Sequence, residues 1–222
     1  MDGFKLFHDR SDAGIRLAKQ LERYRDDHNA IVLAIPRGGV PVGYEVAKTL
    51  HLSLDVFVVR KLGVPFQKEL AMGAIASGDV IFLNNDLIAN LNITNTEINR
   101  VLAEEKMELQ RREIKYRQGH PSPDIAKKNV ILIDDGIATG ASIRSAIDAL
   151  KKLAPNKIII ATPVAPESIM SDLLLLADEV ECIYPAPTFY GVGMLYEDFS
   201  QTSDQEVIAL LSDARKKNNQ KR

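Results

Sequence analysis

The stretch VILIDDGIATGAS, Val130–Ser142, decides the fold. Its four apolar residues, Val130–Ile133, predict a strand that is buried on both faces, as in a parallel sheet. Asp134 and Asp135 follow at the carboxyl end of that strand, which is where open α/β sheets bind their ligands. Small residues then lead into a helix that is predicted from about residue 141 to 153. The stretch therefore predicts a strand, a ligand-binding turn and a helix in succession.

This turn combines two kinds of recognition chemistry. Asp134 and Asp135 offer carboxylate oxygens that accept hydrogen bonds from sugar hydroxyls. The helix start offers unpaired backbone N–H groups and the positive end of the helix dipole, which bind a phosphate. The residues of that predicted phosphate cradle are Gly136, Ile137, Ala138, Thr139, Gly140, Ala141 and Ser142. A ribose with a 5′-phosphate matches both halves. In the alternative interpretation, the acids only end a strand and cap a helix.

Strands and helices alternate along the rest of the chain. Short apolar runs predict further strands at Ile31–Ile35, Leu54–Val59, Lys157–Thr162 and Val180–Tyr184. Helical spacing between them predicts βαβ crossovers, and hence an α/β fold in which helices cover both faces of a central, mostly parallel sheet. A capping box at Ser203–Glu206 predicts a final helix. We expect residues 1–222 to form one domain, with a small hood, the final helix and a polar tail within 185–222.

Composition excludes several classes of protein. Hydrophobic residues make up 45% of the chain, which is enough for a packed core. The net charge of −2 gives no general attraction to nucleic acid or anionic membrane. A single cysteine, Cys182, excludes a disulfide framework, and the four histidines are scattered. Without a signal segment or a bilayer-spanning apolar run, we expect a cytoplasmic protein that binds neither nucleic acid nor membrane.

Competing motifs fit the turn less well. The chain contains no GxGxxG dinucleotide fingerprint, and GIATGAS lacks the lysine of a phosphate-binding P-loop. Gly140–Arg144 lacks the last glycine of a nucleophile elbow, and no histidine is placed to complete a catalytic triad. These patterns disfavour a dinucleotide-binding enzyme, a P-loop phosphotransferase and a serine hydrolase.

The turn resembles a known motif. ILIDDGIATGAS is similar to the phosphoribosyl pyrophosphate (PRPP) motif of type I phosphoribosyltransferases. AIPRGGVPVGYEVA, DVFVVRKLG, ELAMGAIASG and FYGVGMLYEDFSQTSDQEV resemble segments of a group of phosphoribosyltransferase-domain proteins whose acceptor is generally unassigned. The resemblance extends over most of Phe7–Val207. It implies a Mg²⁺-dependent glycosyl (pentosyl) transferase of nucleotide metabolism that transfers 5-phosphoribosyl from PRPP to a nitrogenous base or amine and releases pyrophosphate.

The resemblance also implies roles for two turns. Asp134 and Asp135 would hold the ribose hydroxyls and, directly or through water, the metal. The cradle of residues 136–142 would anchor the 5′-phosphate. Arg37, Gly38 and Gly39 lie in the first βα turn, where glycines let the backbone approach a ligand and the arginine adds a fixed cation. In the resembled family this turn binds pyrophosphate. The alternative is a turn that only redirects the chain.

Arg60 and Lys61 follow the second predicted strand. Two adjacent cations at a strand end are costly to bury without an anion, so we expect a catalytic contact with pyrophosphate there. The alternative is a solvated pair. Leu62–Leu70 resembles the mobile lid of the type I enzymes, with Lys68 as a further contact, although an ordinary surface loop has the same composition.

Phe189–Phe199 carries four aromatic rings among glycines and acids, and it resembles the hood that covers the acceptor. Tyr190 and Tyr196 would stack on a planar ring, and Glu197 or Asp198 would hold a base N–H or a metal-bound water. The alternative is that these aromatic rings pack in the core.

One departure from the family restricts the acceptor. Many 6-oxopurine enzymes have an aspartate where this chain has Ala138, which argues against hypoxanthine or guanine and is compatible with adenine, orotate or another acceptor. The alternative function is a PRPP- or nucleotide-binding regulator without transferase activity. Because the resembled enzymes are frequently dimers, the resemblance also implies a homodimer.

Overall fold

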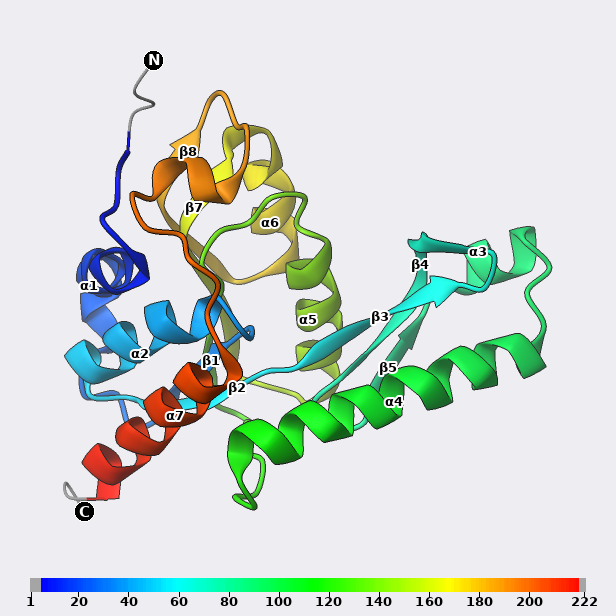
Figure 1. Ribbon diagram of the computed structural model, residues 1–222, viewed down its shortest axis with the longest axis horizontal. Coiled ribbons are helices and arrows are strands. Elements are labelled where there is room, and N and C mark those ends of the chain that lie inside the picture. The colour runs from blue at the N-terminus through cyan, green and yellow to red at the C-terminus, as the bar shows by residue number, and fades with distance from the viewer. Residues whose placement is uncertain (1–4, 220–222) are drawn as a thin grey trace.

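The computed structural model describes residues 5–219, which form a body and an arm (Figure 1). The body is a five-stranded parallel sheet with its covering helices, and the arm is a three-stranded antiparallel sheet with two further helices. Across the body, the strands follow the order β2 (Ser53–Val56), β1 (Ala30–Ala34), β6 (Asn129–Ile133), β7 (Lys157–Pro166) and β8 (Glu179–Ala186).

Helices cover both faces of the parallel sheet, as expected for a doubly covered α/β fold. On β1 and β6, alternate side chains enter two separate cores: Val32 and Ile133 face one, and Leu33 and Leu132 face the other. The first core is covered by α1 (Arg10–Gln20), α2 (Gly39–Leu50) and α7 (Asp204–Asn219), and the second by α5 (Ala141–Lys152) and α6 (Met170–Leu176). Burial on both faces explains why these strands are continuous apolar runs.

The strand order reverses between β1 and β6. From β1 the chain crosses to β2 on one side, whereas β6, β7 and β8 follow in sequence on the other side. Ala34 pairs in register with Ile133, so the segments that leave β1 and β6 emerge side by side. Ligands of open α/β sheets bind at such a reversal, outside the carboxyl ends of the strands.

The arm corrects two expectations. Its elements are β3 (Val59–Val64), β4 (Gln67–Ala76), β5 (Val80–Leu83), α3 (Asn85–Asn90) and α4 (Asn95–Arg117). The second parallel strand ends at Val56 and not at Val59, because the chain leaves the body there and starts β3. The expected loop Leu62–Leu70 is instead a hairpin, in which Val64 pairs with Gln67. Antiparallel pairing thus orders most of a segment whose glycine and proline suggested a loop.

A buried ion pair fixes the root of the arm to the body. Arg117 ends α4, and its guanidinium donates to Asp55 of β2 over 3.2 Å and to Glu113 over 2.5 Å. It also donates to the carbonyl of Val56, where the chain leaves the body. Burial raises the pKa of Asp55, and the charge of Arg117 opposes that shift. The connection is therefore held by charge-assisted bonds within the protein.

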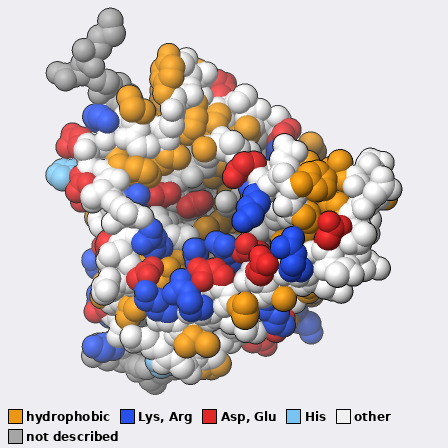
Figure 2. Space-filling view, turned by 45° about the vertical axis from the view of Figure 1, so that its right-hand side comes forward, with side chains coloured by type: hydrophobic (Ala, Val, Ile, Leu, Met, Phe, Trp, Pro, Cys, Tyr) orange, Lys and Arg blue, Asp and Glu red, His pale blue; other side chains and the backbone are white. Residues whose placement is uncertain are grey.

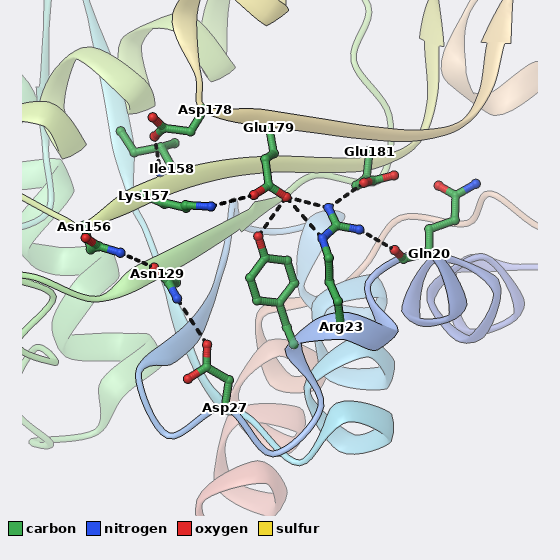
Figure 3. A network of polar contacts seen from close by, with 11 residues as sticks. Gln20, Arg23, Asp27, Asn129, Asn156, Lys157, Ile158, Asp178, Glu179 and Glu181 are labelled. Atoms are coloured by element: carbon green, nitrogen blue, oxygen red, sulfur yellow. Dashed lines mark hydrogen bonds and ion pairs between the residues drawn. The ribbon is translucent and has the colours of Figure 1, made fainter.

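A second polar network fixes the segment after α1 to the edge of the sheet (Figure 3). Glu179 at the start of β8 accepts hydrogen bonds from Arg23 and Tyr24, which lie in the short helix η1 (Glu22–Tyr24), and from Lys157 of β7. Burial raises the pKa of Glu179, but these three donors outweigh it and lower the value to about 2. This network restrains α1, whose first residue is Arg10.

Candidate active site

The turns after β1 and β6 meet at the reversal of strand order. The Ile35 N–H donates to the Ile133 carbonyl over 2.8 Å. A Cβ added at Gly38 would lie 2.0 Å from Oδ2 of Asp135, and one at Gly39 would lie 2.7 Å from the Ile133 carbonyl oxygen. The two turns are therefore in contact, and only glycine fits at these positions. The Pro36–Arg37 peptide bond is cis.

The two adjacent acids have different surroundings. Asp134 is half-buried, and its Oδ1 accepts the N–H of Asp135 over 2.9 Å. Burial, together with the neighbouring charge of Asp135, raises the pKa of Asp134 well above its ordinary value. Asp135 instead pairs with Nε of Arg10 over 2.7 Å, and its side chain is 14% exposed. Among residues 5–219, Arg10 is the one cation that pairs with either carboxylate of this turn, and it contacts Asp135.

The residues of the expected phosphate cradle lie between β6 and α5. Ile137 is buried, and its N–H donates to the Val164 carbonyl over 2.9 Å. Gly140 has a φ of +76°, which favours glycine, and it is the N-cap of α5. Gly140 has no side chain with which to cap the helix, and the Thr139 hydroxyl accepts the Ala141 N–H over a long 3.4 Å. Ala138, Thr139, Ala141 and Ser142 are exposed. The helix start is thus accessible to an anion.

The hood lies directly on the turn after β6. Tyr196 packs between Phe7 and Phe199, with ring centroids 5.2 and 5.0 Å away, and its hydroxyl donates to the Asp135 carbonyl over 2.7 Å. A Cβ at Gly136 would lie 2.3 Å from Val192, in the short helix η3 (Val192–Leu195). Tyr196 is 1% exposed, so the expectation that its ring stacks on an acceptor is wrong. Its role is to pack the hood onto the turn.

The other two acceptor candidates lie at the surface. Tyr190 is 85% exposed, so its ring is accessible to a ligand. Asp198 accepts the Ser200 N–H over 2.8 Å, and this hydrogen bonding lowers the pKa of its carboxyl. Their roles in acceptor binding stay predictions.

Arg60 and Lys61 do not follow the end of a parallel strand, as expected, but lie within β3 of the arm. Arg60 pairs with Glu105 of α4 over 2.6 Å, and Lys61 pairs with Glu69 of β4 over 3.3 Å. Glu105 and Glu69 thus supply the negative charge that we expected pyrophosphate to supply. A catalytic contact would require both side chains to exchange partners. Arg37, by contrast, lies 3.9 Å from Asp204 at the start of α7.

Sequence reasoning missed Arg10. It lies 125 positions from Asp135 and outside every motif, so no local signal indicated the pair. The described part of the chain also contains no group of three or more His, Cys, Asp or Glu side chains placed to hold a metal. Figure 2 shows acidic side chains in a hollow beside the arm, with Lys and Arg side chains interspersed with further acids along its border. None of the helices within residues 5–219 is long and apolar enough to cross a membrane.

The model of the phosphoribosyl transferase domain family matches residues 7–183, a range that includes both turns. The chain belongs to the phosphoribosyltransferase family. It is 42% identical over 210 residues to the protein of Mycobacterium tuberculosis named "Putative phosphoribosyl transferase". That match covers 95% of this chain and 47% of the relative. The chain therefore spans about half the length of the curated relative.

Two further matches differ in extent. A crystal structure of a Thermus thermophilus protein is 35% identical, with a TM-score of 0.83, and the match covers 94% of this chain and 98% of that one. The ribose-phosphate pyrophosphokinase of Haemophilus ducreyi is 26% identical over 110 residues, which is 43% of this chain and 35% of that enzyme. The resemblance to the type I phosphoribosyltransferase fold is thereby confirmed for nearly the whole chain.

Proposed function

We propose that the chain transfers the 5-phosphoribosyl group of PRPP to a nitrogenous base or amine. The contact between the turns after β1 and β6 carries this proposal, because it brings together paired acids, glycine amides and an exposed helix start. The nitrogen of the acceptor forms a bond to C1 of the ribose, the C1–O bond breaks, and pyrophosphate leaves with the electron pair. The proton lost by the acceptor passes to solvent or to the leaving group.

Each part of the substrate has a matching part of the turns. Asp134 and Asp135 accept the ribose hydroxyls and place negative charge near the cation that develops at C1. The amides and hydroxyls of residues 139–142 hold the 5′-phosphate. Arg37 and the amides of Gly38 and Gly39 hold the pyrophosphate. In this proposal the turn after β6 binds the 5′-phosphate end of PRPP, and the turn after β1 binds the pyrophosphate end.

The chemistry of the acids also fits Mg²⁺. Carboxylate oxygens are ligands that Mg²⁺ prefers, and Asp134 and Asp135 would hold it directly or through water. A nearby cation would favour the ionised form of Asp134, whose pKa is raised by burial and by Asp135. When bound, the metal neutralises charge on the departing pyrophosphate. The same residues thus hold both the sugar and the metal.

The hood and the arm supply the remaining residues of the proposed site. Tyr190 and Asp198 would contact the acceptor from the hood. Arg60 and Lys61 would reach the pyrophosphate only after leaving Glu105 and Glu69. Because Ala138 provides no base, we expect an acceptor other than hypoxanthine or guanine. A homodimer, which the family resemblance implies, and a cytoplasmic location, which we expect from the sequence, complete the proposal.

One observation favours a different function, that of a PRPP- or nucleotide-binding regulator. Arg10 forms an ion pair with the carboxylate of Asp135, and Val192 lies against Gly136. Residues of α1 and of the hood therefore cover the turn after β6. A binding protein without turnover tolerates such a cover better than an enzyme, which must admit an acceptor and release product.

The test is a screen of bases and amines with Mg–PRPP that follows pyrophosphate release, with PRPP affinity measured by calorimetry. We expect release with at least one acceptor, and none with hypoxanthine or guanine. Measurable PRPP affinity without release for any acceptor would favour the regulator. Absence of PRPP binding would contradict both functions.

A further inference from the structure

Arg10 connects two parts of the molecule that are far apart in sequence. On one side, its Nε donates to Oδ2 of Asp135 over 2.7 Å. On the other side, its Nη1 donates to the Ser200 carbonyl over 2.7 Å, and its guanidinium lies 3.9 Å from the ring centroid of Phe199. The side chain of Arg10 is 11% exposed. One planar group therefore contacts the acid of the turn and the end of the hood together.

The hood contacts of Arg10 are themselves held in place. Phe199 packs against Tyr196, with ring centroids 5.0 Å apart, and a Cβ at Gly193 would lie 2.8 Å from the Phe199 ring. The ring that faces the guanidinium therefore has little freedom to move. Such a cation over an aromatic face is attracted more strongly when both groups are shielded from water.

The acid contact of Arg10 determines how Asp135 points. The Tyr196 hydroxyl donates to the carbonyl oxygen of Asp135 and so restrains its backbone. The direction of the carboxylate then depends on the side-chain torsion angles of Asp135. Nε of Arg10 and the adjacent backbone of Gly38 bound Oδ2 from two directions. The carboxylate therefore cannot turn without moving either the guanidinium or the first βα turn.

We propose that Arg10 is a positioning residue that couples the ribose-holding carboxylate of Asp135 to the order of the hood. This inference rests on the proposed function. When ribose hydroxyls fix Asp135, Arg10 is held in the orientation that binds Ser200 and Phe199, and the hood becomes ordered over the acceptor. By linkage, an acceptor that orders the hood tightens the binding of PRPP by the same factor.

Only a guanidinium has the shape for this role. Its planar fork donates from Nε to one partner and from Nη1 to another in fixed directions, whereas a lysine ammonium is a single point on a flexible stem. Arg10→Lys therefore keeps the charge beside Asp135 but separates it from the hood. We expect that variant to lose the coupling while it keeps the fold.

The experiment measures hydrogen–deuterium exchange in peptides that cover residues 189–200, with and without saturating Mg–PRPP. In the wild type we expect PRPP to slow exchange there by about tenfold, and in Arg10→Lys we expect almost no change, even though PRPP is bound. Arg16→Lys is the matched control, because Arg16 lies on the same helix, pairs with Asp12 over 2.8 Å and faces Phe7. A purely structural role for Arg10 would lower stability but leave the ligand-induced slowing intact, and that result would overturn the proposal.

A second comparison, without ligand, separates this inference from the proposed function. Asp135→Asn and Arg10→Lys should each speed exchange in residues 189–200 severalfold, with circular dichroism confirming that both variants are folded. Phe199→Leu, which removes the ring from the guanidinium and from Tyr196 but keeps the pair of Arg10 and Asp135, should change exchange in the same direction. Unchanged exchange in all three would show that Arg10 does not tie the hood to the acid. If the wild type fails to bind PRPP, the proposed function fails, and the coupling to sugar binding fails with it.

Discussion

The turn after β6 and the strand β3 each contain two adjacent residues of like charge, but the surroundings of the two pairs differ. Asp134 and Asp135 lie at the carboxyl end of a parallel strand, where the neighbouring turn contacts them. Arg60 and Lys61 lie within an antiparallel hairpin, where each pairs with a carboxylate of the arm. Within residues 5–219, Asp135 pairs with Arg10 and Asp134 has no cation paired with it, whereas both cations of the arm pair with a carboxylate. The difference teaches that charges at the carboxyl edge of the parallel sheet are less fully neutralised by the protein than charges within the hairpin.

The two pairs also differ in what their surroundings do to the charge. Burial and mutual repulsion raise the pKa of Asp134, so the body holds its acids at a cost in stability. The cations of the arm each pair with a carboxylate of the arm. Unfavourable electrostatics in a folded protein are typical of functional sites. The comparison therefore predicts that substitutions in the turn affect function strongly, and that substitutions in the arm affect it weakly.

The largest effect is expected from removing the charge of the turn. Asp135→Asn should lower kcat/KM for PRPP by about 100- to 1000-fold, which corresponds to roughly 3–4 kcal/mol of transition-state stabilisation. Lys61→Gln, as the matching change in the arm, should lower it by less than about tenfold. Steady-state kinetics of pyrophosphate release give both numbers. Undiminished turnover in a variant with both Asp134→Asn and Asp135→Asn would remove the acids from the mechanism.

The contact between the two turns should be nearly as sensitive. Gly39→Ala places a methyl group 2.7 Å from the Ile133 carbonyl oxygen, a backbone atom that cannot move aside, so it should cost about 1–3 kcal/mol of stability and weaken PRPP binding at least tenfold. Urea unfolding and calorimetry measure these quantities. The control is Gly119→Ala, where no atom lies within 4 Å and only the positive φ opposes the change. Equal loss of PRPP affinity in both variants would refute the specific role of the contact.

The raised pKa of Asp134 predicts a stability difference that depends on pH. Because the folded state binds this proton more tightly than the unfolded state, the carboxyl stabilises the fold below its ordinary pKa near 3.8, and this contribution is lost as the pH rises toward the raised value. Asp134→Asn should therefore be more stable than the wild type at pH 7, by about 1 kcal/mol, although it is less active. The difference should shrink as the pH falls to 4. Denaturant midpoints at pH 4 and pH 7 test this, and a difference that grows in acid would contradict it.

The smallest effect concerns the partner of Arg60. Glu105→Gln frees the guanidinium, and if Arg60 then reaches pyrophosphate, PRPP affinity should rise by up to about threefold, which is less than 1 kcal/mol. Glu108→Gln is the matched control, since Glu108 pairs with Arg111 and Arg112 elsewhere on α4. Calorimetry compares the two variants. No difference between them, together with an unaffected Arg60→Gln, would leave the arm cations with a structural role only.

The elements of the body could be predicted from sequence because their signals are local. Continuous apolar runs marked the strands, and the alternation with helical spacing predicted the parallel sheet. The capping box at Ser203–Glu206 is confirmed in part by the Glu206 N–H, which donates to the Ser203 hydroxyl at the start of α7. The final residues of the expected tail, 220–222, lie outside the described part of the chain. The hairpin of β3 and β4 was missed because Gly63 and Pro65 are typical of loops, whereas Gly63 pairs with Ala71 of β4 and Pro65 lies in the turn between the two strands.

The sequence by itself determined the strand–turn–helix unit of residues 130–142, the chemistry that its acids and glycines offer, and the family to which it belongs. These features depend on neighbouring residues, whose spacing is visible in one dimension. Only the tertiary structure decided that Arg10 faces Asp135, that Tyr196 is packed in the hood, and that Arg60 faces Glu105. Each of these contacts joins segments distant in sequence, and its geometry is set by how whole elements pack. No local pattern of residues encodes such packing.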